Sequence, residues 1–155
     1  MTLVLVLALC IGFFAGLRSL AAAAATAWAA RLGWLQLASP LALIGSLPSV
    51  LIFTVLALAE IVADKLPKTP SRTSPPGLIT RILMGGLSGA CVAAAGGQSA
   101  LAGAGLGAVG GVAGCYAGYY ARTGLVRKLG TPDWPVALVE DLIAVGGSLL
   151  IVSRL

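Results

Sequence analysis

The stretch ALAGAGLGAVGGVAGCYAGYYA, residues 100–121, decides the fold class of this chain. It contains no charged residue, and it is long enough to cross a bilayer as a helix, which takes about 20 apolar residues. Its glycines recur at a spacing of four, and in lipid such glycine faces let another backbone approach closely. The packing residues predicted in this way are Gly103, Gly107, Gly111, Gly110, Gly114 and Gly118.

Gly85 and Gly89 repeat this spacing in the apolar stretch that precedes residue 100. Two such surfaces are enough for one neighbour within the chain and for a second subunit, and we therefore expect a homo-oligomer, most simply a dimer. A thin-walled pore or a sliding interface between helices is the alternative interpretation of the same glycines.

The whole chain of 155 residues shares this apolar character. Hydrophobic residues make up 59% and charged residues 10% of the chain, and the mean hydropathy is +1.02. These values exclude a water-soluble globule. Backbone groups in lipid must be satisfied within the chain, and runs of Ala, Gly and Leu without alternation exclude a β-barrel. We predict an all-α integral membrane protein, with residues 1–155 forming one transmembrane domain.

We predict a compact bundle of about five transmembrane helices. They run from about Leu3 to Ala30, Pro40 to Leu66, Pro76 to Ala95, Ala100 to Ala121 and Trp134 to Val152. The first contains Arg18 and the second contains Pro48, and both are longer than a minimal span. The extra length allows tilt, a kink or a re-entrant piece.

Basic residues mark two of the connections between these helices. They are Lys65, Lys68, Arg72 and Arg81 around one connection, and Arg122, Arg127 and Lys128 in the other. Two helices separate the connections, so both lie on one side of the membrane, which the positive-inside rule makes the cytoplasmic side. The predicted N-terminus is therefore inside and the C-terminus outside.

The acidic residues form two groups, one around Glu60 and Asp64 and the other from Asp133 to Asp141. Glu60 and Asp64 are four residues apart and share a helix face. A carboxylate as deep in a helix as Glu140 is costly in lipid, so it should face the bundle interior, a watery cavity or a basic partner. The predicted cation or proton site consists of Glu60, Asp64, Glu140 and Asp141.

Arg18 lies near the middle of the first apolar stretch and needs a partner there. Glu60, Glu140, Asp141 and a bound anion are the candidates. Arg81 is expected to extend its head group to the cytoplasmic interface. Arg18, Lys65 and Arg81 are the predicted counter-ions of the acidic site. A purely structural ion-pair network is the alternative interpretation of all these charges.

Residue types needed for other functions are missing or scattered. The chain has no histidine, and Cys10, Cys91 and Cys115 lie singly in apolar stretches, so we predict no metal site and no cofactor. No serine or cysteine has a base at motif spacing, which argues against an enzyme. The excess of basic residues belongs to helix connections, so nucleic acid is not an expected partner.

Two segments resemble each other weakly. LALAEIVADKLP, residues 56–67, aligns with VALVEDLIAVGG, residues 136–147, and places Glu60 opposite Glu140. An offset of three crossings would make this an inverted repeat, an architecture common in transporters. Inversion would place the two glutamates at opposite depths, whereas the charges place both on one side, so chance similarity of Ala/Leu-rich sequence is the competing explanation.

Four elements also resemble a known family. They are GLRS at 16–19, AEIVADKLP at 59–67, the stretch from Arg81 to Gly89, and PVALVEDLIA at 135–144. With them the chain resembles a family of small bacterial membrane proteins catalogued as a domain of unknown function (DUF4126). KTPSRTSPP, residues 68–76, departs from the more acidic linker of that family. The resemblance implies a multi-pass fold in the bacterial inner membrane and implies no activity.

These observations favour one function over another. We predict a transporter or channel that moves a cation, a proton or a small charged solute past intramembrane carboxylates. Its expected partners are the lipid bilayer and a second copy of the chain. The alternative is a non-catalytic subunit of a larger membrane complex, in which the same charges only hold helices together.

Overall fold

A computed structural model describes residues 2–64, 73–130 and 132–155 of the chain. Within these ranges the chain forms six α-helices, one short 3-10 helix and no strand. The helices are α1 (Thr2–Leu17), α2 (Ser19–Arg31), η1 (Leu41–Gly45), α3 (Leu47–Ala63), α4 (Pro75–Ala95), α5 (Ala100–Leu129) and α6 (Asp133–Val152). The prediction of an all-α fold is confirmed.

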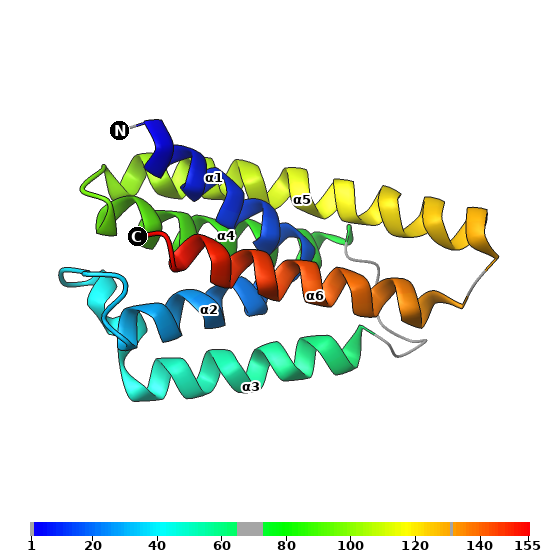
Figure 1. The fold of residues 1–155 in the computed structure, drawn as a ribbon, viewed down its shortest axis with the longest axis horizontal. Helices are drawn as coiled ribbons and strands as arrows, with labels where there is room; N and C mark the ends of the chain where they lie inside the picture. Colours follow the sequence, from blue (N-terminus) through cyan, green and yellow to red (C-terminus); the bar gives the residue numbers. More distant parts are fainter. Residues whose placement is uncertain (1, 65–72, 131) are drawn as a thin grey trace.

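The broken first segment lies at the centre of the bundle. Both α1 and α2 pack against α4 and α6, while α5 covers α1 and α4 on one side and α3 covers α2 on the other. Figure 1 shows the six helices running roughly along the long axis of the molecule, with α5 and α3 at opposite edges. The break between α1 and α2 is therefore surrounded by α3, α4, α5 and α6.

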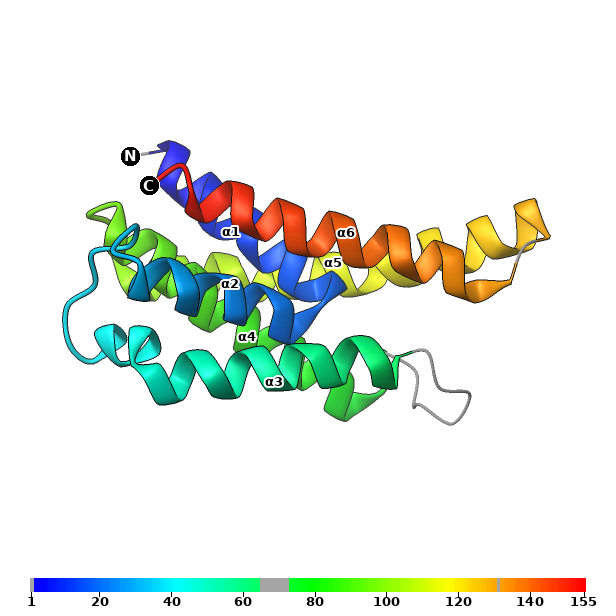
Figure 2. The same ribbon diagram turned by 60° about the horizontal axis from the view of Figure 1, so that its bottom comes forward.

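The chain reverses direction at Arg18, where the sequence predicts one continuous helix. Arg18 has φ −139° and ψ 99°, an extended conformation that ends α1 and begins α2. Figures 1 and 2 show α1 running into the bundle and α2 returning toward the end from which α1 came. The predicted single crossing from Leu3 to Ala30 is therefore wrong, and a pair of shorter helices, of 16 and 13 residues, takes its place.

The second predicted segment also begins differently from the expectation. Leu41–Gly45 forms the 3-10 helix η1, and α3 begins only after Ser46, whose side chain accepts a hydrogen bond from the backbone N–H of Ser49. Pro48 lies in the first turn of α3, where its missing N–H costs nothing. The proline therefore starts this helix instead of kinking its interior.

The glycines of α5 bring three backbones together. A Cβ atom added at Gly107 would collide with the backbone oxygen of Gly85 in α4, and one added at Gly114 would collide with the backbone oxygen of Phe13 in α1. All six predicted packing glycines are buried: Gly103, Gly107, Gly110, Gly111, Gly114 and Gly118. Five of them, Gly103, Gly107, Gly110, Gly111 and Gly114, meet atoms of α1 or α4 and so offer no open surface to the predicted second subunit.

Three helices, α4, α5 and α6, are long and apolar enough to cross a membrane. The apolar helices α1 and α3 are shorter than such a span. The described residues thus supply membrane-compatible helices, as the composition predicts. The predicted number of about five full spans is not confirmed: within the described ranges, the first long segment is divided into α1 and α2 and the second into η1 and α3.

The start of α1 and the end of α6 lie at the same end of the bundle (Figures 1 and 2). The sequence predicts termini on opposite sides because it counts the stretch from Leu3 to Ala30 as one crossing. The reversal at Arg18 adds a change of direction that this count leaves out.

The inverted repeat also finds no support in the helices. It pairs the first apolar stretch with α5, yet α5 continues unbroken from Ala100 to Leu129 while the first stretch divides at Arg18. The similarity between residues 56–67 and 136–147 therefore does not extend to a shared helical unit.

Candidate functional site

The break at Arg18 leaves a helix end without its usual hydrogen-bond partners, and Glu60 satisfies it. The first N–H groups of a helix have no acceptor within the helix and carry a partial positive charge. The Glu60 carboxylate, from α3, accepts from the backbone N–H of Ser19 (3.1 Å), the Ser19 hydroxyl (2.7 Å) and the N–H of Leu20 (2.9 Å). Glu60 thereby caps the start of α2.

Arg81, from α4, serves the other side of the break. Its Nε donates to the backbone oxygen of Gly16 at 2.9 Å, and its Nη1 donates to the backbone oxygen of Gly77 at 3.0 Å. A cation is favourable at the end of α1, where unsatisfied carbonyl groups carry partial negative charge. Arg81 is buried, so the prediction that it extends to the interface is wrong: the end of α1 offers it acceptors inside the bundle.

Arg18 is fully buried and paired with two carboxylates. Its Nε lies 2.5 Å from Oδ1 of Asp141 in α6, and its Nη1 lies 2.7 Å from Oδ2 of Asp64 at the end of α3. Asp141 was among the partners expected from the sequence. Two carboxylates close to one guanidinium offset the cost of removing that charge from water.

Arg122 extends the network along α5. Its Nε lies 2.8 Å from Oδ1 of Asp133, and a second bond joins its Nη2 to Asp133. Its Nη1 lies 2.7 Å from Oδ2 of Asp64 and 3.6 Å from Oε2 of Glu140. Asp64 is therefore shared between Arg18 and Arg122, and it links the helix break to α5.

The structure thus brings together three of the four predicted acidic residues, Asp64, Glu140 and Asp141, in one ion-pair network. Glu60 lies apart, at the start of α2, and Lys65 lies outside the described residues. Arg122 and Asp133 were not among the predicted site residues. The signal for Arg122 was obscured because the sequence places a helix end at Ala121, whereas α5 continues to Leu129 and carries Arg122 within the helix.

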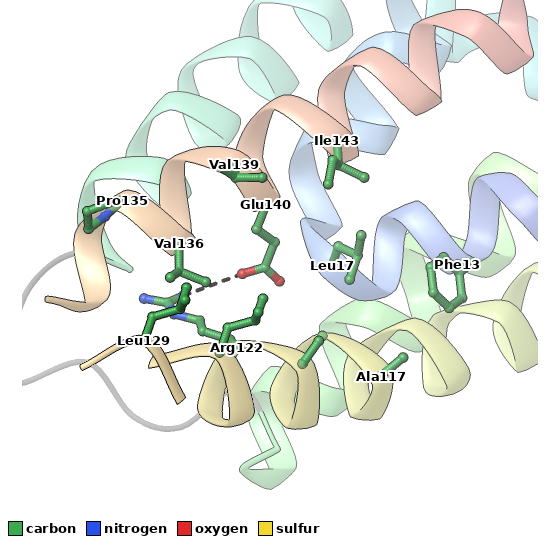
Figure 3. Close-up of a pocket in the computed structure, with 13 residues that line it drawn as sticks. Phe13, Leu17, Ala117, Arg122, Leu129, Pro135, Val136, Val139, Glu140 and Ile143 are labelled. Carbon is green, nitrogen blue, oxygen red and sulfur yellow. Dashed lines mark ion pairs between the residues drawn. The ribbon is translucent and has the colours of Figure 1, made fainter. Parts of the chain in front are cut away.

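A cavity of about 470 Å³ lies beside this network, between α5 and α6. Arg122 and Glu140 are its charged lining residues, and we call it the α5–α6 groove. Figure 3 shows the Glu140 carboxylate turned toward Arg122, with Leu129 and Pro135 on one side of Glu140 and Leu17 and Phe13 of α1 on the other. The remaining lining residues are apolar or glycine: Ala117, Gly118, Ala121, Leu125, Leu129, Pro135, Val136, Val139 and Ile143.

Within the described ranges, no group of three or more His, Cys, Asp or Glu side chains is arranged to hold a metal ion. Cys10, Cys91 and Cys115 are free thiols. Cys91 and Cys115 are buried among packed helices. The charged groups that the structure gathers here are carboxylates and guanidinium groups; both bind opposite charge, and the carboxylates can also exchange protons.

Fold and site together define an all-helical protein with membrane-length helices and a buried arginine–carboxylate network at its centre. The family model described as Domain of unknown function (DUF4126) matches residues 5–153, and the chain belongs to this family. The resemblance seen in the sequence elements is thereby confirmed. Comparisons with curated proteins and with solved structures gave no match.

Proposed function

We propose that this protein is a transporter or channel of the bacterial inner membrane that moves a cation, a proton or a small charged solute past Glu140. The observation that carries the proposal is the position of Glu140. Its residue is 9% exposed, its carboxylate belongs to the ion-pair network, and it lines the α5–α6 groove. A solute in the groove therefore reaches a charged group that is otherwise buried.

A buried carboxylate suits this task because its oxygens bind hard cations and exchange protons. Ionisable groups inside a membrane helix are costly and usually mark ion or proton pathways. Asp64 and Asp141 would act with Glu140 by holding the two arginines, while Glu60 and Arg81 hold the helix break in place.

Asp64, which pairs with both Arg18 and Arg122, suggests how a solute bound in the groove affects the break between α1 and α2. A cation bound at Glu140 competes with Arg122, whose Nη1 is 3.6 Å from that carboxylate. Arg122 then interacts more strongly with Asp64, which also holds Arg18 at 2.7 Å. In this scheme, binding at α6 alters the charge balance at the break between α1 and α2.

The proposed orientation places the end of the bundle that carries Arg127 and Lys128 in the cytoplasm, by the positive-inside rule. Because α1 begins and α6 ends at the opposite end (Figure 1), both termini then lie on the outer side of the membrane. Homodimer formation remains a prediction, and a dimer would have to use lipid-facing surfaces such as the exposed side of α3.

Flux through liposomes containing the purified protein tests the proposal. The panel comprises monovalent and divalent cations and pH gradients, applied to the wild type, Glu140→Gln and Glu140→Asp. We expect flux in the wild type, loss in Glu140→Gln, and partial retention in Glu140→Asp, which keeps the charge. Undiminished flux in a folded Glu140→Gln protein would contradict the assignment, and silence of the folded wild type would favour the partner-subunit alternative.

A further inference from the structure

The α5–α6 groove is apolar apart from one pair of charged residues. With Arg122 and Glu140 set aside, every lining residue is apolar or glycine. Its volume of about 470 Å³ lies within the range of small-molecule sites, which are typically apolar with a few well-placed polar groups. A hydrated inorganic ion would leave most of this surface uncovered, so the groove suits a larger, amphipathic occupant.

The groove also opens on the flank of the bundle. Four large apolar residues that line it are more than 40% exposed: Leu125, Leu129, Val139 and Ile143. All four are apolar and belong to α5 and α6, the two helices that form the groove walls. In a membrane this flank faces lipid, so an apolar molecule can reach the groove from the hydrocarbon phase.

The two charged residues of the groove favour a positive occupant. Arg122 already donates two hydrogen bonds to Asp133 and one to Asp64. An anion would have to displace these carboxylates from Arg122. The Nη1 of Arg122 lies 3.6 Å from Oε2 of Glu140, which is longer than a hydrogen bond. A cation beside the Glu140 carboxylate would therefore leave the bonds from Arg122 to Asp133 and Asp64 in place.

We propose that the α5–α6 groove binds hydrophobic cations, molecules with a quaternary or delocalised positive charge on an apolar body. The charge lies at Glu140, and the apolar body lies along Phe13 and Leu17 of α1 and the walls of α5 and α6. This inference names a substrate class for the transport site proposed above and rests on that proposal. It concerns binding, which can be measured separately from flux.

Equilibrium dialysis of the purified wild-type protein in detergent, against tetraphenylphosphonium and tetraphenylborate, tests the sign of the charge. The two probes have closely similar shapes and opposite charges. We expect saturable binding of the phosphonium and at least about tenfold weaker binding of the borate, because a buried like-charge contact is strongly unfavourable. Glu140→Gln should weaken phosphonium binding by at least about tenfold, and Glu140→Asp by less.

A matched pair of variants tests the place of binding without changing charge. Ala121 lines the groove, whereas Ala113 is exposed on the same helix outside it. Ala121→Phe should fill the groove and weaken phosphonium binding by at least about tenfold, while Ala113→Phe should leave it within about twofold.

The outcomes separate this inference from the transport proposal. Preferential binding of the borate, or equal phosphonium binding by wild type, Glu140→Gln and Ala121→Phe, would overturn it. Ion flux that depends on Glu140 without phosphonium binding would leave the transport proposal standing and remove this one. Phosphonium binding that depends on Glu140, in a protein silent across the ion panel, would establish the groove and count against inorganic ions as the cargo.

Discussion

The two halves of α5 contact neighbouring helices differently: the first through backbone atoms, the second through side chains. From Ala100 to Gly114 the helix presents glycines, and the backbones of α1 and α4 press directly against it. Beyond Cys115 it carries larger residues such as Leu125 and Leu129, and the α5–α6 groove separates it from α6. Arg122 bridges that second half to carboxylates on α3 and α6.

The difference shows that one helix combines two kinds of stabilisation. Close backbone contact gains dispersion energy at many atoms and tolerates no added side chain. Ion pairs can join helices that are not in close backbone contact. Their stabilising effect is lost when one charge is removed, because its buried partner is then left uncompensated. We therefore expect an added side-chain atom to destabilise the first half most, and the loss of a charge to destabilise the second half most.

The largest expected effect comes from removing a charge. Arg18→Met leaves Asp141 and Asp64 without the guanidinium that lies 2.5 Å and 2.7 Å from them. Breaking a buried ion pair costs about 3–5 kcal/mol, so the free energy of unfolding in detergent micelles should fall by about that amount. Adding Asp141→Leu should restore part of the loss. If Arg18→Met alone is as stable as the wild type, the ion pairs of Arg18 do not stabilise the break between α1 and α2.

A smaller loss should follow from adding one methyl group to the glycine-packed half. In Gly107→Ala the new Cβ meets the backbone oxygen of Gly85, which cannot move without shifting α4. Overpacking of this kind costs about 1–3 kcal/mol, measured again by unfolding in micelles. If Gly107→Ala is as stable as the wild type, the backbones are not in contact in solution.

The cap on α2 ranks next. Glu60→Ala removes the acceptor for the N–H groups of Ser19 and Leu20. Loss of such a cap destabilises a helix start by about 1–2 kcal/mol. Glu60→Gln keeps one oxygen acceptor and should lose less. Equal losses in the two variants would mean that the glutamate's packing matters more than its hydrogen bonds.

The smallest expected effect has the opposite sign. Gly105 lies two residues from Gly107 on the same helix, yet a Cβ added there meets nothing within 4 Å. Gly105→Ala should therefore stabilise the protein by up to about 1 kcal/mol through helix propensity alone. A destabilised Gly105→Ala would mean that this face of α5 is also covered, for instance by a second copy of the chain.

Much of the site was visible in the sequence as a set of residue types. Asp64, Glu140, Asp141 and Arg18 stood out because charge is costly in an apolar stretch, and the structure brings these four into one network. Their pairing was not visible, because Arg18 and Asp141 are 123 residues apart in the chain. Arg122 was missed because local composition at residues 122–129 resembles a connection as much as a helix.

The sequence by itself determined the all-helical, membrane-compatible class, since composition and hydropathy act locally and leave the backbone no other way to satisfy its hydrogen bonds in lipid. It also indicated where backbones could approach closely, because glycine leaves the most space for a neighbouring backbone. The tertiary structure alone decided that the first stretch breaks at Arg18, that the chain's ends lie together, and that Glu140 borders a groove. Those outcomes depend on which distant carboxylates surround a buried guanidinium, and only the packed bundle brings them together.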